Sequence, residues 1–287
     1  MTAARVPGEV VVSGLAFPEG PRWHHDALYF SDVHSHQVLR WRAGTLEVVA
    51  HVPGRPSGLG FLDEETLLVS SQEDRRVHRV DLRTPGAPPV VHADLGRVAT
   101  WHLNDLLTDA RGRAYVGNYG DGAPPGEPIA PAALALVDVD GSVRAVADEL
   151  FFPNGMALLD EGRTLVVAET RSEPGRLTAF DVSADGSLRG RRTLIAFTGQ
   201  WPDGIAADRH GTLWVACPFD AEVLRVSADG RIVGRVAVPD PYAVAIGGDD
   251  GTDLFVATAD TWVPEEAAVV RSGRILVFRG VAADAPR

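Results

Sequence analysis

The sequence predicts an all-β chain folded as a six-bladed β-propeller, and three observations lead to that prediction. A short pattern of turn, strand, Asp/Gly hairpin and second strand recurs six times along the 287 residues. The copies are spaced by roughly 40 to 50 residues, which is the length of a four-stranded propeller blade. Further strand-like alternation of apolar and polar residues follows the copies, and no stretch keeps a helical period for long.

The clearest copy of the repeat runs from Pro202 to Ala216. Its opening turn, Pro202-Asp203-Gly204, leads through a short strand and a turn at Gly211 to the strand Leu213–Ala216. In chain order the other copies are Pro18–Ser31, Pro56–Ser71, Leu103–Asn118, Pro153–Glu169 and Tyr242–Thr258. The last copy keeps its hairpin turn but has Tyr-Ala-Val where most of the others carry Pro-x-Gly.

Further strands complete the predicted blades and close the ring. Alternating segments follow four of the copies at Gln37–Trp41, Arg76–Val80, Arg176–Phe180 and Glu222–Val226. The last unit supplies Arg274–Phe278, and we expect the N-terminal strand Glu9–Ser13 to pair with it. That pairing would close the circle and remove an exposed edge strand, which invites aggregation. We therefore expect one domain over residues 1–287.

Composition and charge exclude several classes of function. Hydrophobic residues make up 45% of the chain, enough for a core, and the formal net charge is −12. Because a negative protein repels phosphate backbones and anionic membranes, we expect no nucleic-acid partner and no membrane partner. Residues 1–9 lack the apolar stretch of a signal peptide and no apolar run has membrane-spanning length, which favours a cytoplasmic location. Nothing in the sequence predicts an oligomeric state.

The absence of lysine, the single cysteine and the placement of the histidines exclude further kinds of catalytic and metal site. Lysine is absent and all 27 basic residues are arginine, which excludes Schiff-base catalysis, a pyridoxal-phosphate anchor and the P-loop. The single cysteine, Cys217, lies on a predicted strand, where a thiol is usually a small buried apolar group. The pairs His24-His25 and His34/His36 fall in turns without further ligands at zinc spacing. The acidic segment 249–253 lacks the closing glutamate of an EF-hand, so we interpret it as a hairpin turn.

Four polar residues stand at the head of four repeats, namely Glu19, Asn104, Asn154 and Asp203. Asn, Asp and Glu beside glycine are common turn formers, and for a single repeat that interpretation would suffice. These four, however, precede the strand that lines the central channel of a propeller, so closure of the ring brings them together. Carboxylates gathered there would repel each other unless a cation neutralised them.

This set of side chains predicts one divalent metal ion with open coordination positions. Two carboxylates and two amide carbonyls suit a hard cation, Ca²⁺ first, with Mg²⁺, Mn²⁺ or Zn²⁺ as alternatives. Four protein ligands leave positions for water and substrate, as a catalytic metal requires.

The ordered series of motifs resembles the family of gluconolactonase, regucalcin (senescence marker protein) and related lactone hydrolases over essentially the whole chain. The matching segments are Phe17–Trp23, Leu28–Asp32, Asn104-Asp105, Phe152–Gly155 and Trp201–Gly204. The resemblance implies a six-bladed propeller with a divalent metal at the top of the central channel. It also implies metal ligands at Glu19, Asn154 and Asp203, with Asn104 as a substrate contact or a fourth ligand.

Two segments could determine which substrate is bound. The first, residues 101–102, differs from the sugar lactonases of that family, and the second, residues 120–128, is a loop that varies between the repeats. In those lactonases an arginine precedes the substrate-binding asparagine by two residues, whereas here His102 stands there, next to Trp101. Both residues are candidates for lining a substrate pocket, and a simple aldonolactone is not the only substrate to consider. The Pro/Gly-rich segment 120–128 leaves an inner strand, and we predict that it forms a lid or rim that helps to select the substrate.

The residues and the resemblance together predict metal-assisted hydrolysis of a small-molecule lactone or ester. The metal would polarise the carbonyl, and Asp203 would act as general base or as nucleophile. Glu19 and Asn154 would hold the ion, while Asn104 and His102 would orient the substrate. Two alternatives stay open: a phosphotriester or fluorophosphate hydrolase using the same metal site, and a non-catalytic calcium-binding propeller that acts as a scaffold.

Overall fold

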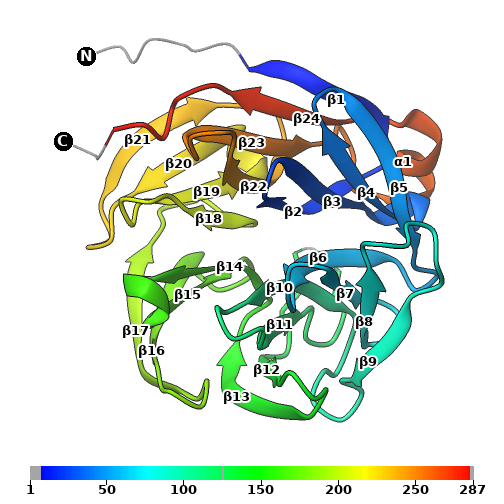
Figure 1. Ribbon diagram of the computed structural model, residues 1–287. Helices are drawn as coiled ribbons and strands as arrows, with labels where there is room; N and C mark the ends of the chain where they lie inside the picture. Colours follow the sequence, from blue (N-terminus) through cyan, green and yellow to red (C-terminus); the bar gives the residue numbers. More distant parts are fainter. Residues whose placement is uncertain (1–7, 125, 285–287) are drawn as a thin grey trace.

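The computed structural model describes residues 8–124 and 126–284, and it confirms the six-bladed propeller. Six four-stranded antiparallel sheets surround a central axis (Figure 1). Residues 1–7, where we predict no signal peptide, and Pro125 of the predicted rim lie outside the described residues, as do residues 285–287.

Each blade is one sheet whose strands follow one another in chain order, except the last, which takes its outer strand from the N-terminus. Blades one to three consist of β2 (Pro18–His24), β3 (Ala27–Asp32), β4 (Gln37–Arg42) and β5 (Thr45–His51); β6 (Pro56–Phe61), β7 (Thr66–Ser71), β8 (Arg76–Asp81) and β9 (Val90–Asp94); and β10 (Leu103–Thr108), β11 (Ala114–Asn118), β12 (Ala132–Val137) and β13 (Val143–Leu150). Blades four to six consist of β14 (Pro153–Leu159), β15 (Thr164–Glu169), β16 (Arg176–Val182) and β17 (Leu188–Ala196); β18 (Ile205–Ala207), β19 (Leu213–Cys217), β20 (Glu222–Val226) and β21 (Ile232–Ala237); and β22 (Pro241–Gly247), β23 (Asp253–Thr258), β24 (Gly273–Phe278) and β1 (Glu9–Leu15).

The N- and C-terminal strands close the ring as the sequence predicts. β1 pairs antiparallel with β24, with Glu9 opposite Val277 and Val10 opposite Leu276. The first strands of the six blades, β2, β6, β10, β14, β18 and β22, contact their neighbours around the axis (Figure 1). The residues that these inner strands carry at one height therefore meet around the axis of the propeller.

The register of the hairpins puts one position of every repeat at the same height. The first residue of an inner strand lies opposite the last residue of the second strand, as in Pro18 with Asp32, Pro56 with Ser71, Leu103 with Asn118, Pro153 with Glu169 and Pro241 with Thr258. In blade five the Asp203 N–H donates to the carbonyl of Ala216, which gives the same register. The sixth repeat therefore opens on Pro241-Tyr242-Ala243, and our alignment of Tyr242 with the proline is wrong by one residue.

The glycine of the Pro-x-Gly motif lets neighbouring inner strands approach closely. A Cβ atom on Gly155 would lie 2.4 Å from the backbone nitrogen of Ile205 and 2.5 Å from the carbonyl oxygen of Asp203. No side chain fits there, since real Cβ atoms do not approach so closely. Apolar clusters then fill the space between adjacent sheets, such as Leu28, Phe30, Phe255 and Ile275 between blades one and six.

In residues 8–124 and 126–284, helical structure occurs only in short connections. The three 3-10 turns are η1 (Val33–Ser35), η2 (Asp160–Gly162) and η3 (Pro218–Asp220), and the α-helix is α1 (Pro264–Val270). Our reading of the sequence missed α1, although Pro264 followed by two glutamates is a helix-start signal. Within the part of the chain that the structure describes, no helix combines the length and apolarity needed to cross a bilayer.

Candidate functional site

Six residues occupy the position after the first residue of the repeat, one in each blade. We call this set the axial ring; in order around the axis it consists of Glu19, Ser57, Asn104, Asn154, Asp203 and Tyr242. The structure thus brings the four residues singled out from the sequence into one layer. It adds Ser57 and Tyr242, which the sequence reasoning missed. The prolines directly before them, Pro56 and Pro241, are the signal that would have found both.

The surroundings of Glu19 and Asp203, the two carboxylates of the axial ring, disfavour the ionised form of both. Burial, helped by the Asp105 carboxylate, raises the pKa of Glu19 to about 8, although the Gly20 N–H donates to its Oε2 at 2.9 Å. Burial also raises the pKa of Asp203 well above its usual range, and the Glu19 carboxylate is the next cause, while a hydrogen bond from Asn154 acts the other way. Two groups that resist ionisation together are stabilised by a cation placed between them.

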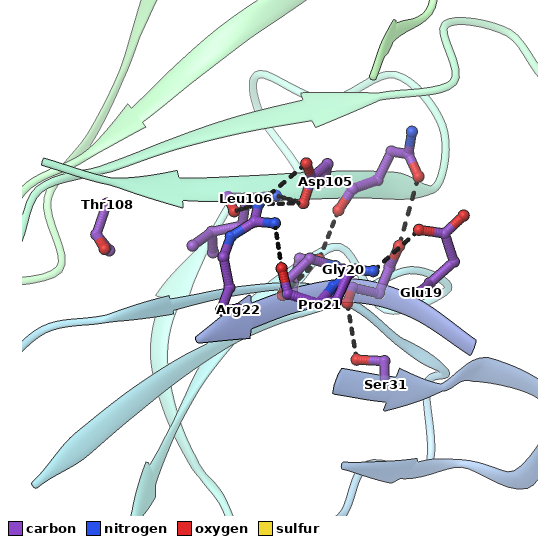
Figure 2. Close-up of polar contacts among 12 residues, drawn as sticks. Glu19, Gly20, Pro21, Arg22, Ser31, Asp105, Leu106 and Thr108 are labelled. Atoms are coloured by element: carbon purple, nitrogen blue, oxygen red, sulfur yellow. Dashed lines mark hydrogen bonds and ion pairs between the residues drawn. The ribbon is translucent and has the colours of Figure 1, made fainter. Parts of the chain in front are cut away.

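A partly buried ion pair involves Arg22, three residues after Glu19 on β2 (Figure 2). Arg22, on the same strand, donates from Nη2 to Oδ1 of Asp105 at 2.8 Å and to the carbonyl oxygen of Leu106 at 2.7 Å. The two side chains are only 16% and 9% exposed. The pair ties β2 to β10 and therefore links the strands of two axial-ring residues.

The two asparagines of the axial ring present different atoms. Asn154 donates from Nδ2 to Oγ1 of Thr170 at 3.0 Å, and Thr170 in turn donates to the carbonyl of Pro202 at 2.7 Å. This leaves Oδ1 of Asn154 as an oxygen donor for a cation. Oδ1 of Asn104 instead accepts from the Ser57 hydroxyl at 3.4 Å, and its buried Nδ2 has no partner among the described residues. Asn104 therefore offers an N–H, which suits a substrate oxygen better than a cation.

The donor set fits a hard divalent cation. The carboxylates of Glu19 and Asp203 and the free oxygen of Asn154 are all oxygen ligands, the type that Ca²⁺ and Mg²⁺ prefer. Anywhere in residues 8–124 and 126–284, no three His, Cys, Asp or Glu side chains are grouped closely enough to hold a metal. The axial ring would complete such a set with an amide oxygen, that of Asn154, beside its two carboxylates.

An aromatic wall, formed by Trp101, His102, Tyr119 and Phe152, runs from the surface toward the axial ring. The rings of Trp101 and His102 stack with centroids 4.8 Å apart, and Tyr119 stacks on Phe152 at 4.3 Å. Burial raises the pKa of Tyr119, and the carboxylates of Glu19 and Asp203 add to the effect. Burial lowers the pKa of His102, which favours the neutral imidazole. Trp101 is 45% exposed and is the outermost member.

The rim loop, described at residues 119–124 and 126–131 between β11 and β12, packs against this wall. A Cβ atom on Gly122 would lie 2.4 Å from Nε1 of Trp101, so the loop backbone lies directly on the indole. Arg171 binds the loop from blade four: its Nη2 donates to the carbonyls of Pro124 at 2.8 Å and Glu127 at 2.5 Å. A cavity of about 460 Å³ lies beside the loop and is lined in part by Ile129, Phe151, Thr170 and Trp201.

Two buried carboxylates that the sequence reasoning did not single out hold the segments just before axial-ring residues. Oδ1 of Asp32 accepts the Phe17 N–H at 2.8 Å, two residues before Glu19. In the equivalent place of blade four, Oε2 of Glu169 accepts the Phe151 N–H at 2.9 Å. Each of these carboxylates belongs to the last residue of the second strand of its blade. An acidic residue at that strand end is the sequence feature that would have predicted this role.

The other candidates from the sequence have structural roles. His36 bonds through Nδ1 to the carbonyl of Pro53 at 2.8 Å, and His24 stacks on Phe61 with centroids 3.8 Å apart. Cys217 is fully buried, as expected for a small apolar group. Residues 249–252 of the acidic segment form the hairpin turn between β22 and β23, and Asp253 is the first residue of β23.

Comparison with known proteins decides the family. The model of the SMP-30/gluconolactonase/LRE-like region matches residues 17–260, which include every residue of the axial ring. The chain belongs to the SMP-30/gluconolactonase/LRE-like family. The resemblance inferred from the motifs is thereby confirmed.

Individual members of the SMP-30/gluconolactonase/LRE-like family are similar over most of the chain. A pentonolactonase from Haloferax volcanii is 28% identical over 275 residues, which cover 90% of this chain and 86% of the relative. A calcium-binding protein, regucalcin from Agrobacterium tumefaciens, has the same fold with a TM-score of 0.79 and 21% identity, covering 96% of this chain and 94% of its own. A gluconolactonase from Xanthomonas campestris aligns with a TM-score of 0.75 and 23% identity, covering 96% and 91%.

Proposed function

We propose that this protein is a divalent-metal-dependent lactonase that hydrolyses a small-molecule lactone to the hydroxy acid. The observation that carries the proposal is the axial ring, where the buried carboxylate of Asp203 and the half-buried carboxylate of Glu19 lie with the free amide oxygen of Asn154. The family supports it, and so does the pentonolactonase among the relatives. Ca²⁺ is the proposed ion, because its preference for oxygen donors matches this set and a regucalcin of the same fold is a calcium-binding protein.

The proposed ligands are Glu19, Asn154 and Asp203. A bound divalent ion would supply electrophilic assistance to the lactone carbonyl and balance the two negative charges. Thr170 fixes the side-chain amide of Asn154 so that its oxygen, not its nitrogen, is free. The Gly20 N–H and the Arg22–Asp105 pair hold Glu19 and its strand in place.

The remaining side chains orient the lactone and move its protons. Asp203 accepts a proton from the attacking water, whose oxygen bonds to the carbonyl carbon. The unpaired N–H of Asn104 donates to a substrate oxygen. The aromatic wall, with Trp101 and His102, and the rim loop bound by Arg171 shape access to the ring. His102 stands where the sugar lactonases of the family carry an arginine, so the proposed substrates include lactones other than aldonolactones.

The test is turnover of a lactone panel by the wild type, by Asp203→Asn and by the matched control Asp220→Asn. Asp220 is an exposed carboxylate of the same blade, just beyond β19. We expect Asp203→Asn to lose about 10²- to 10⁴-fold in kcat, as expected when a general base is removed, and Asp220→Asn to keep its activity. Chelation should abolish turnover, and added Ca²⁺ should restore it.

Two results would contradict the proposal. Faster turnover of phosphotriesters such as paraoxon than of any lactone would favour the alternative hydrolase class. Calorimetric Ca²⁺ binding without hydrolysis of any ester would favour a scaffold.

A further inference from the structure

Tyr242 stands between the only two carboxylates of the axial ring. Around the axis, blade six lies between blades five and one, so Tyr242 is flanked by Asp203 on one side and Glu19 on the other. The Gly204 N–H donates to the carbonyl of Tyr242 at 2.8 Å, which fixes its backbone against the strand segment of Asp203. On the other side the ring of Phe17 meets the phenol edge-on at a centroid distance of 4.7 Å.

The hydroxyl group of Tyr242 differs from those of the other three tyrosines. Tyr115 donates to a carbonyl at 3.0 Å, Tyr29 accepts from Arg40 at 3.4 Å, and Tyr119 accepts from Gln72 at 3.5 Å. Within the described part of the chain, the Tyr242 hydroxyl makes no hydrogen bond and is not among the fully buried unpaired atoms, while the residue as a whole is 7% exposed. A phenol that lies between the strands of the two carboxylate residues, with its O–H free, is available to a bound molecule.

A proton donor assists the opening of a lactone whose leaving group is an alkoxide. When the tetrahedral adduct collapses, the bond between the carbonyl carbon and the ring oxygen breaks and leaves an alkoxide, which is a poor leaving group unless it is protonated. The chain has no lysine, and none of the nine histidines is a member of the axial ring.

We propose that Tyr242 donates its hydroxyl proton to the departing ring oxygen of the lactone. Water supplies the oxygen that bonds to the carbonyl carbon, and its proton goes to Asp203. The C–O ring bond breaks as the phenol proton moves to the alkoxide, and the proton on Asp203 then returns to the phenolate, so one water is added overall. This role rests on the proposed lactonase function and assigns a further catalytic residue to it.

The experiment compares Tyr242→Phe with the matched control Tyr29→Phe, which removes the same atom from a residue of β3 that is not a member of the axial ring. Two lactones serve as probes: δ-valerolactone, whose leaving group is an alkoxide, and dihydrocoumarin, whose leaving group is a phenoxide that needs no proton. We expect kcat of Tyr242→Phe to fall about 10²- to 10⁴-fold on δ-valerolactone and less than tenfold on dihydrocoumarin. Ca²⁺ affinity, measured by calorimetry, should stay unchanged, and Tyr29→Phe should behave like the wild type on both lactones.

Three results would count against Tyr242 as the proton donor. An equal loss on both lactones, or no loss on δ-valerolactone, would overturn the role of Tyr242 while leaving the lactonase function intact. Failure of the wild type to open either lactone would overturn the proposed function and this role with it. If Tyr242→Phe does not fold, the wild type alone decides: kcat on aliphatic and aryl lactones should depend little on leaving-group basicity, and a steep dependence would refute proton donation.

Discussion

The close approach of inner strands at Gly155 can be tested with a single methyl group. In Gly155→Ala the new Cβ atom would lie 2.4 Å from the backbone nitrogen of Ile205, whereas ordinary Cβ contacts begin at 3.4 Å. The strand of blade five must therefore move by about 1 Å, and it carries Asp203 with it. Overpacking of this kind costs about 1–3 kcal/mol of unfolding free energy. A displacement of about 1 Å at reacting groups costs about 100-fold in rate.

Urea unfolding and lactone turnover measure the two effects separately. Gly234→Ala is the matched control, because the nearest atom to its new Cβ would be Cβ of Arg225 at 3.4 Å, an ordinary contact. We expect the control to unfold and turn over like the wild type, and Gly155→Ala to show both losses. A Gly155→Ala protein with the urea midpoint and kcat of the wild type would refute the argument that Asn154 and Asp203 depend on this contact.

Three further predictions concern groups around the axial ring. Burial alone would raise the pKa of Glu169, but hydrogen bonds to its carboxylate have the larger effect, and the pKa lies below its usual value. The ionised carboxylate therefore stabilises the fold at neutral pH, and this stabilisation is lost as the pH falls through the pKa of the folded state. Urea unfolding of Glu169→Gln should therefore show a deficit of about 3 kcal/mol at pH 7 that shrinks in acid; a deficit independent of pH would contradict this. Arg22→Met leaves Asp105 buried without its partner and should cost about 3–5 kcal/mol in the same assay, and a cost below about 1 kcal/mol would show that the pair is dispensable. Arg171→Ala frees the rim loop and should change relative kcat/KM across a lactone panel with little change in urea midpoint; an unchanged ranking of substrates would exclude the loop from selection.

The repeat allowed most of the fold and four axial-ring residues to be predicted, because a closed propeller must put equivalent residues at one height. Tyr242 was not predicted as a site residue because Ala243 replaces the glycine of the motif. Without that glycine, the sixth repeat was aligned one residue out of register. The Arg22–Asp105 pair joins residues 83 positions apart in two different blades, and no local pattern encodes that contact. The free atom of each asparagine depends on its neighbour, Thr170 or Ser57, and becomes visible only when the blades are assembled.

A crystal structure of the protein grown with Ca²⁺ tests the central claim most directly, namely that the axial ring holds one catalytic divalent ion. We predict a single ion bound by oxygens of Glu19, Asn154 and Asp203 at about 2.3–2.6 Å, with water at the open positions and the Tyr242 hydroxyl facing them. An axial ring that stays free of metal at saturating Ca²⁺, or an ion bound only by residues outside it, would contradict the claim.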